Sequence, residues 1–316
     1  MGQVTVTRVS VIIPVHNREK LIAGAVRSVV QQEIPNVEII VIDDGSTDLS
    51  GEAARAADDR ITVIRRARAG GPSAARNAGI AVAQGEWIAF LDSDDQWPTG
   101  SLEPRLASAE RDAGTVLVSA DASAWDGERV LSERLLGVQP IGPRDDPFLR
   151  LLAGNFVITS TVLARKESVI AVGGFSEGLR FCEDYDLWLR LARRGRFDFV
   201  DKPAALYRVE ASGLSGDRDA MFQSEIAILE ALLDPQRGLT RREAETVERR
   251  ITDLHLERGY EDLIAGRSTC ARRKLLVALR RRAATPSALA YFAASFLPHP
   301  FVRLLRRARG RPWSAP

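Results

Sequence analysis

Three carboxylates fall within four positions of the sequence, at Asp92, Asp94 and Asp95, directly after the apolar run 88–91. Carboxylates this close repel one another and raise one another's pKa unless a cation or capping hydrogen bonds balance the charge. A loop of solvated acids is the simplest explanation. Because the apolar run predicts a buried strand that ends at these acids, we favour a hard divalent cation shared with a phosphate group.

A second group of acids, Glu183, Asp184 and Asp186, begins the helical pattern "EDYDLWLRLA". Acidic residues in the first turn favour the helix dipole, so helix capping alone would explain the group. The residues alone do not assign these acids a further role.

Two further polar stretches suit the binding of a nucleotide. Asp43 and Asp44, in "DDGSTD", could accept hydrogen bonds from a nucleobase and a ribose, although a turn at the glycine explains part of that motif. The stretch "GGPSAARNAGIAVAQGEW" places Arg76 and Asn77 near the start of a predicted helix. A helix N-terminus with an arginine binds anions, and the alternative is an arginine on a solvated helix face.

Short apolar runs alternate with helical stretches from residue 8 onward, and this order positions the polar groups. Strands are predicted at "RVSVIIP", "VEIIVID", "ITVIRR" and "EWIAFLD". The order predicts βαβ units that build a Rossmann-like α/β fold, with a mainly parallel sheet covered by helices on both faces. Ligands collect outside the carboxyl ends of such strands, where the polar clusters 14–19, 43–48 and 92–97 fall.

The same order indicates how the chain divides. We expect a nucleotide-binding half at 8–115 and an acceptor-side half at 116–216, which together form a catalytic domain at 1–216. Strand patterns vanish after that point. A helical extension is therefore predicted at 217–316.

The extension is strongly basic, although the whole chain of 316 residues has a formal net charge of only +2. Residues 263–316 contain 12 Arg or Lys and no Asp or Glu. Such a block suits an anionic partner, such as lipid headgroups or nucleic acid, or an acidic face of the same chain. Its aromatic residues stand among aliphatic ones rather than among the charges, so we do not expect nucleic acid as the partner.

Residues 286–313 have the pattern of an interfacial helix, because "SALAYFAASFL" is too short to span a bilayer and "FVRLLRRARGR" mixes apolar residues with arginines. We expect this segment to bind anionic membrane surfaces, and the alternative is that it packs on the rest of the chain. No apolar run is long enough to span a membrane, and the first residues lack the order of a signal peptide. We therefore expect a cytoplasmic protein, peripheral on the cytoplasmic face of the membrane.

Four motifs together resemble the family 2 glycosyltransferases, an inverting group with the A-type glycosyltransferase fold. They are "VSVIIPVHNRE", "VEIIVIDDGSTD", "SAARNAGIAVAQGEWIAFLDSDD" and "VGGFSEGLRFCEDYDLWLRLARRG", and the resemblance covers about residues 8 to 212. It implies transfer of a sugar from a nucleotide-diphosphate donor, most often a UDP-sugar, to a hydroxyl group of a saccharide or lipid-linked acceptor. Bacterial surface polysaccharide or glycolipid assembly is the expected setting.

The resemblance also implies roles for single residues. The metal, Mg²⁺ or Mn²⁺, would be held by Asp94 as the most direct ligand, with Asp92 and Asp95 beside it. Asp184 would be the general base, and Glu183 would orient the acceptor. Trp97 would line the donor site. The residues expected at the nucleotide are Pro14, Val15, Asn17, Asp43, Asp44, Arg76, Asn77, Asp92 and Ser93.

One departure from the family pattern lies after the Tyr-Arg pair in "LYRVEASGLSGD", where Glu210 stands in place of a frequent His. Glu210 could replace that His as an oxygen ligand, and Arg208 and Ser215 are candidates for phosphate contacts. The acceptor would meet segments in 120–180, including "GNFVITST", whose composition does not identify it.

Two other functions compete with glycosyl transfer. The Asp-x-Asp of "IAFLDSDD" also suits a haloacid-dehalogenase-type phosphatase, but that chemistry needs the motif near the start of its domain and here it follows the fourth strand. A non-catalytic, glycosyltransferase-like scaffold at the membrane is the other alternative. The presence of both Asp94 and Asp184 argues against it.

Overall fold

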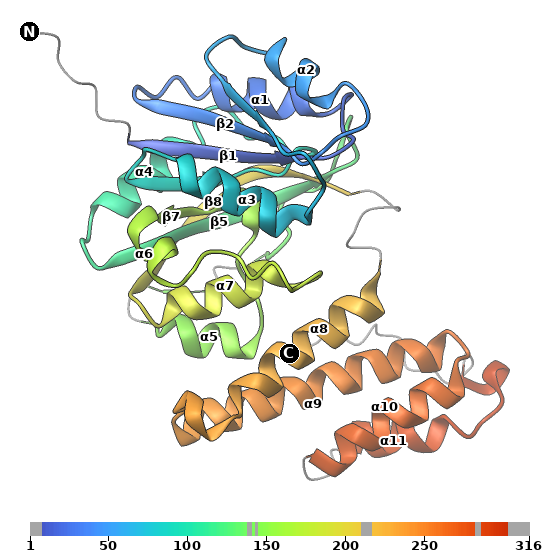
Figure 1. Ribbon diagram of the computed structural model, residues 1–316. Coiled ribbons are helices and arrows are strands. Elements are labelled where there is room, and N and C mark those ends of the chain that lie inside the picture. The colour runs from blue at the N-terminus through green and yellow to red at the C-terminus, as the bar shows by residue number, and fades with distance from the viewer. Residues whose placement is uncertain (1–7, 138–140, 143–144, 210–216, 282–285, 303–316) are drawn as a thin grey trace, which may run out of the picture. The chain divides into compact units, whose positions relative to one another are not determined.

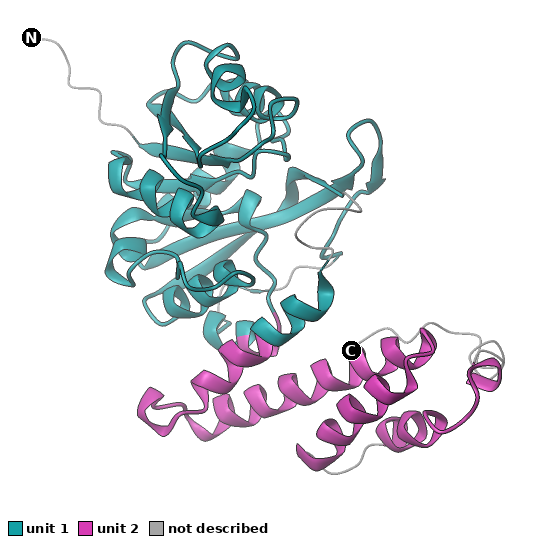
Figure 2. Ribbon diagram, turned by 45° about the vertical axis from the view of Figure 1, so that its right-hand side comes forward, with its two compact units in different colours: residues 1–151, 155–224 teal, residues 152–154, 225–316 magenta. Residues whose placement is uncertain are grey.

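The computed structural model describes residues 8–302 except 138–140, 143–144, 210–216 and 282–285 (Figure 1). Glu210, Ser215 and the part of the predicted interfacial segment after residue 302 lie outside the described residues. Two compact units are present, Met1–Leu151 with Asn155–Ser224, and Leu152–Gly154 with Glu225–Pro316 (Figure 2). The units divide within helix α8 (Arg218–Leu232), eight residues after the boundary predicted at 216.

The first unit has the predicted α/β fold, built on one sheet that is mixed, with both parallel and antiparallel pairs. Its strands run in the order β3-β2-β1-β4-β7-β5-β6, and β8 pairs with β5. The first four strands are parallel to one another, whereas β7 runs antiparallel to both β4 and β5. The strands are β1 Val9–Val15, β2 Val37–Asp43, β3 Thr62–Arg65, β4 Trp87–Phe90, β5 Thr115–Trp125, β6 Val130–Ser132, β7 Leu163–Arg165 and β8 Arg196–Arg208.

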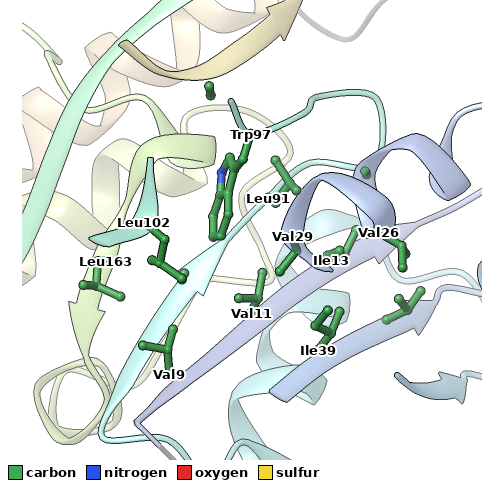
Figure 3. Close-up of a cluster of buried hydrophobic side chains, with 14 of the residues drawn as sticks. Val9, Val11, Ile13, Val26, Val29, Ile39, Leu91, Trp97, Leu102 and Leu163 are labelled. Carbon is green, nitrogen blue, oxygen red and sulfur yellow. The ribbon is translucent and has the colours of Figure 1, made fainter. Parts of the chain in front are cut away.

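Helices cover both faces of this sheet, which explains why β1 is apolar without alternation. Val11 and Ile13 pack in the cluster that contains Val26 and Val29 of helix α1 (Figure 3). Ile12 points to the other face, where a Cβ on Gly79 of helix α3 would lie only 2.5 Å from its side chain. The helices of this unit are α1 Ile22–Val30, α2 Ser50–Arg55, α3 Gly71–Val82, α4 Leu102–Glu110, α5 Pro147–Ala153, the 3₁₀ turn η1 Thr159–Thr161, α6 Lys166–Ala171 and α7 Glu183–Ala192.

The register of the parallel strands brings their polar ends to one edge of the sheet. Val15, the last residue of β1, pairs with Asp43 at the end of β2, and Ile12 pairs with Phe90 at the end of β4. The segments that follow these strands therefore lie at the same edge, as the motif positions predict.

The second unit is helical. A capping box of Thr240 and Glu243 begins the long helix α9, and α9, α10 and α11 share a small apolar core around Leu275 and Ala288. Among the helices of the described residues, none has both the length and the apolar character to span a membrane. The elements are the rest of α8, the 3₁₀ turn η3 Pro235–Arg237, α9 Arg241–Ile264, α10 Ser268–Arg281 and α11 Pro286–Ala294.

Candidate active site

The segments after β1 and β2 are joined by side-chain hydrogen bonds. Asn17 has a left-handed backbone (φ 52°), and its side-chain oxygen accepts a hydrogen bond of 2.8 Å from the backbone N–H of Thr47. The backbone N–H of Asn17 donates to the hydroxyl of Ser46. Pro14 and Val15 are buried in β1 itself. At the predicted nucleoside border, Asn17 thus connects the segments that follow β1 and β2.

Asp43 and Asp44, predicted to contact the base, both have partners within the fold. The Asp44 carboxylate accepts hydrogen bonds of 2.9 and 2.8 Å from the backbone N–H groups of Gly70 and Gly71 at the start of α3. Asp43 accepts one of 2.9 Å from the backbone N–H of Ser46. The anion at the N-terminus of α3 is therefore a carboxylate of this chain, and the base contact stays a prediction.

Arg76 is buried and is held by two acids rather than exposed to a diphosphate. Its guanidinium donates to Asp92 at 2.6 Å and to Glu183 at 2.9 Å. Burial alone would lower the pKa of Arg76, but the charges of Asp92 and Glu183 outweigh burial and raise it. The phosphate contact of Arg76 stays a prediction. Arg76 instead joins the end of β4 to the start of α7.

Asn77 also has a different partner from the one predicted. Its side-chain NH₂ donates to the backbone carbonyl of Phe175 at 2.9 Å, and its side-chain oxygen accepts from the backbone N–H of the same residue at 2.9 Å. These bonds fix the loop that precedes α7. The ribose contact of Asn77 stays a prediction.

The three acids of the loop after β4, together with Ser93, have unequal surroundings. The side chains of Asp92 and Asp94 are 31% and 29% exposed, and Arg18 lies 3.8 Å from Asp94. Asp95 is buried, and it accepts hydrogen bonds from the Ser160 hydroxyl at 2.5 Å and the Arg208 backbone N–H at 2.8 Å. Burial and the nearby Asp92 charge raise the pKa of Asp95 well above its usual range. Ser93 is buried as well.

These surroundings decide which acids fit a cation. Asp95 is less suited to the predicted role of metal ligand than Asp92 and Asp94, because it is buried and both of its oxygens accept hydrogen bonds within the fold. No group of three His, Cys, Asp or Glu side chains suited to a metal occurs in the described part of the chain. Mg²⁺ is commonly held by one or two carboxylates plus substrate phosphates. Asp94 and Asp92 therefore fit a cation that a diphosphate completes.

Asp184 lies in the first turn of α7, after the left-handed backbone of Cys182 (φ 58°). Its carboxylate accepts hydrogen bonds from the Tyr185 backbone N–H at 2.7 Å and the Thr159 hydroxyl at 3.1 Å. Burial, and next the charge of Glu183, raise the pKa of Asp184 to about 6. Such a carboxylate is ionised at neutral pH yet basic enough to accept a proton.

The neighbouring acids are less suited to proton transfer. Glu183 is bonded to Arg76, and Asp186 accepts hydrogen bonds from Ser176 at 2.6 Å and from Arg190 at 2.6 Å. Of the three acids at the start of α7, Asp184 is the one to which none of these hydrogen bonds comes from an arginine. Its bond from the Thr159 hydroxyl is also not a helix-capping bond.

Three buried features lie beside these acids, namely Trp97, Arg105 and the turn η1. Trp97, predicted to line the donor site, is 2% exposed in the core cluster of Figure 3, and its ring N–H donates to the Ser160 carbonyl at 2.7 Å. The buried Arg105 stacks on that ring at 4.3 Å. The hydroxyl residues of η1 bond to residues 92–95, which we call the acid loop, and to Asp184. The only visible signal is the run "TST" in the stretch expected to meet the acceptor.

Known proteins share this sequence pattern and this fold. The family model "Glycosyl transferase family 2" matches residues 10–172. An Escherichia coli protein named UDP-Glc:alpha-D-GlcNAc-diphosphoundecaprenol beta-1,3-glucosyltransferase WfaP is 30% identical over 215 residues, which cover 66% of this chain and 80% of WfaP.

Two solved structures share the fold over nearly the whole chain. Residues 1–349 of TarS from S. aureus, in complex with UDP-GlcNAc, align with a TM-score of 0.66 at 17% identity, over 97% of this chain and 93% of that one. The mannosyltransferase PcManGT from Pyrobaculum calidifontis, in complex with GDP-Man and Mn²⁺, aligns with a TM-score of 0.63 at 20% identity, over 95% and 83%. With the family model matching more than half of its length, this chain belongs to glycosyl transferase family 2.

Proposed function

We propose that this glycosyltransferase moves a sugar, with inversion, from a nucleotide-diphosphate donor to an acceptor hydroxyl, with Asp184 as the general base. The main observation behind the proposal is that one arginine links the acids after β4 to the acids at the start of α7. Arg76 bonds both to Asp92 in the acid loop and to Glu183, the residue before Asp184. Arg76 thus connects the acids proposed for the donor's metal to the segment that contains the proposed base.

In the proposed reaction the Asp184 carboxylate takes the proton of the acceptor hydroxyl while that oxygen attacks the anomeric carbon. The bond from that carbon to the diphosphate oxygen breaks, and the nucleoside diphosphate leaves with the electron pair. Glu183, fixed by Arg76, would orient the acceptor with its second carboxylate oxygen. A bound Mg²⁺ or Mn²⁺ at Asp94 and Asp92 would supply neutralisation of the charge on the leaving diphosphate.

The known relatives support a particular donor and acceptor. WfaP is named for UDP-Glc and for an acceptor on diphosphoundecaprenol, and TarS was solved with UDP-GlcNAc. We therefore propose a UDP-sugar as donor, and an acceptor on a polyprenyl-type lipid diphosphate in surface polysaccharide or glycolipid assembly. PcManGT was solved with Mn²⁺, which supports the proposed metal dependence.

A panel of nucleotide sugars tests this function. With Mn²⁺ or Mg²⁺ present, one UDP-sugar should raise Tm and be slowly hydrolysed, and excess chelator should abolish both effects. Asp184→Asn should keep the rise in Tm but lose turnover. Full activity in excess chelator would contradict the proposed metal dependence. Release of inorganic phosphate would favour the phosphatase alternative, and absence of any turnover would favour the scaffold.

We further propose that the second unit binds anionic membrane surfaces, at the cytoplasmic face where nucleotide sugars are available. Four large apolar side chains on and after α11 are exposed and form what we call the apolar tail patch: Leu289, Phe296, Leu297 and Phe301. Arg272 stacks on Phe296 with 4.8 Å between the guanidinium carbon and the ring centre. Apolar side chains beside arginines are typical of interfacial segments.

The charge of this region favours anionic lipid over a second copy of the chain. Part of it is balanced internally, since Arg267 and Lys274 pair with Asp262. Arg273 and Arg280 are exposed, and five more arginines follow at 303–311 in the sequence. Each cation near an anionic surface contributes about 1 kcal/mol, and salt weakens that contribution.

Vesicle sedimentation tests the membrane proposal. The full chain should sediment with anionic vesicles at low salt and stay in solution with zwitterionic vesicles. The triple change Leu289→Ser, Phe296→Ser and Phe301→Ser should abolish sedimentation, whereas the control Val130→Ser with Leu131→Ser, at exposed apolar residues of the first unit, should not. Equal loss in both variants, or a wild type that stays in solution, would contradict the proposal, and a dimer in solution would assign the patch to a second copy.

A further inference from the structure

Three consecutive hydroxyl side chains, Thr159, Ser160 and Thr161, form the 3₁₀ turn η1, which we call the hydroxyl turn. All three residues are buried, with 8%, 1% and 0% of their surface exposed. Buried hydroxyl groups are costly unless they are hydrogen-bonded, so the partners of these groups indicate why they are present. Each of the three bonds to a different element of the site or the sheet.

Thr161 anchors the turn in the sheet. Its hydroxyl accepts a hydrogen bond of 3.2 Å from the backbone N–H of Ala120 in β5, and its one O–H is shared between the carbonyls of Ile158 at 2.8 Å and Ala120 at 3.0 Å. The guanidinium of Arg105 donates to the backbone carbonyl of Thr161 at 2.9 Å. The turn is therefore a fixed part of the core and able to hold other groups in place.

Ser160 holds the acid loop. Its hydroxyl donates to the carboxylate of Asp95 at 2.5 Å and accepts from the backbone N–H of Asp92 at 3.2 Å. One side chain thus bonds to the first and the last acid of the loop. Asp94 lies between these two bonded residues, so its position depends on the bonds.

Thr159 holds the proposed base. Its hydroxyl donates to Asp184 at 3.1 Å, on the carboxylate oxygen that does not accept from the Tyr185 backbone. The other charged groups that act on Asp184 are Glu183, on the same helix, and Arg76, on α3. Thr159 is thus the neutral side-chain donor that fixes the direction of this carboxylate.

We propose that Thr159 and Ser160 are positioning residues for the transfer reaction, in which Thr159 orients the Asp184 carboxylate and Ser160 fixes the shape of the acid loop. Because the two residues are adjacent in one anchored turn, they also fix the separation between the base and the donor-binding acids. A displacement of about 1 Å at a reacting group costs on the order of 10²-fold in rate. This inference rests on the proposed role of Asp184.

Single substitutions in the turn separate the two roles. Thr159→Val should lower kcat about 10-fold and leave the donor KM unchanged. It should also shift the acid limb of the pH–rate profile upward by about half a pH unit, because the hydrogen bond from Thr159 favours the ionised form of Asp184 and so lowers its pKa. Thr159→Ser should restore both values. Ser160→Ala should instead raise the donor KM and the half-saturating Mn²⁺ concentration several-fold without a shift of the acid limb.

A matched control separates positioning from loss of stability. Thr252→Val removes a similarly buried hydroxyl in α9 of the second unit, where it donates to the Glu248 carbonyl, and should lower Tm without a change in kcat, KM or pH profile. If Thr159→Val has the wild-type profile, or if Thr159→Ser fails to restore it, the positioning role is wrong. If Asp184→Asn keeps turnover, the base assignment fails first and this proposal fails with it. If Asp184→Asn is inactive and Thr159→Val is normal, this proposal alone fails.

Discussion

The substitution Arg76→Met should be among the most destabilising in the first unit. The Arg76 side chain is 5% exposed and bonds to Asp92 and Glu183, so its loss leaves two acids near the core without their cation. Removal of one partner from a buried ion pair costs about 3–5 kcal/mol. At about 2–4 °C per kcal/mol for a unit of roughly 150–250 residues, Tm should fall by about 6–20 °C.

Thermal unfolding followed by circular dichroism measures this shift, with Arg60→Met as the matched control. The Arg60 side chain is 68% exposed and pairs with Asp58, and an exposed pair contributes about 0–1 kcal/mol, so the control should change Tm by only a few degrees. Adding Asp92→Asn and Glu183→Gln to Arg76→Met should recover part of the loss, because the acids no longer need a cation. Equal Tm values for the two arginine variants would refute the reasoning.

Three other perturbations have distinct expected outcomes. Asp184→Asn should raise the free energy of unfolding at pH 8 by up to about 3 kcal/mol, measured by urea denaturation. The pKa of Asp184 is raised from 3.8 to about 6, so the stability that this carboxyl contributes is present below pH 4 and is lost as the pH rises through 6. No gain at pH 8 over pH 4 would contradict the raised pKa. Asp94→Ala should abolish transfer with Tm within about 2 °C of the wild type, whereas the buried Asp95→Ala should lower Tm by more, and the reverse order would reverse their assigned roles. Gly174→Ala should lower Tm more than Gly173→Ala. Both glycines have positive φ (67° and 85°), but only at Gly174 would an added Cβ lie 2.6 Å from the side-chain oxygen of Asn77 in α3, and equal shifts in Tm would rule out that contact.

The sheet and its ligand edge could be predicted because they depend on local pattern. Apolar runs without alternation require cover on both faces, and a βαβ order gives parallel strands whose ends coincide. The pairing of Val15 with Asp43 and of Ile12 with Phe90 follows from those two facts. The antiparallel direction of β7, between β4 and β5, did not follow, because an apolar run indicates a strand but not its direction.

The partners of the site residues could not be predicted, because they come from distant parts of the chain. Arg76 and Glu183 are 107 positions apart, and Asn77 and the Phe175 carbonyl are 98 apart. A helix N-terminus with an arginine predicts an anion, and two anions are indeed bonded to Arg76. Both are carboxylates of the chain, and a pattern of residue types does not distinguish them from a phosphate.

The unequal partners of the three crowded acids explain how the chain tolerates them and which one is suited to a cation. Asp92 is balanced by the buried cation of Arg76, and Asp95 is buried with a raised pKa and two hydrogen bonds. Asp94 has Arg18 at 3.8 Å, the outer limit of an ion pair, and both side chains are about a third exposed, where such a pair contributes little. We therefore propose Asp94 as the most direct ligand of the cation.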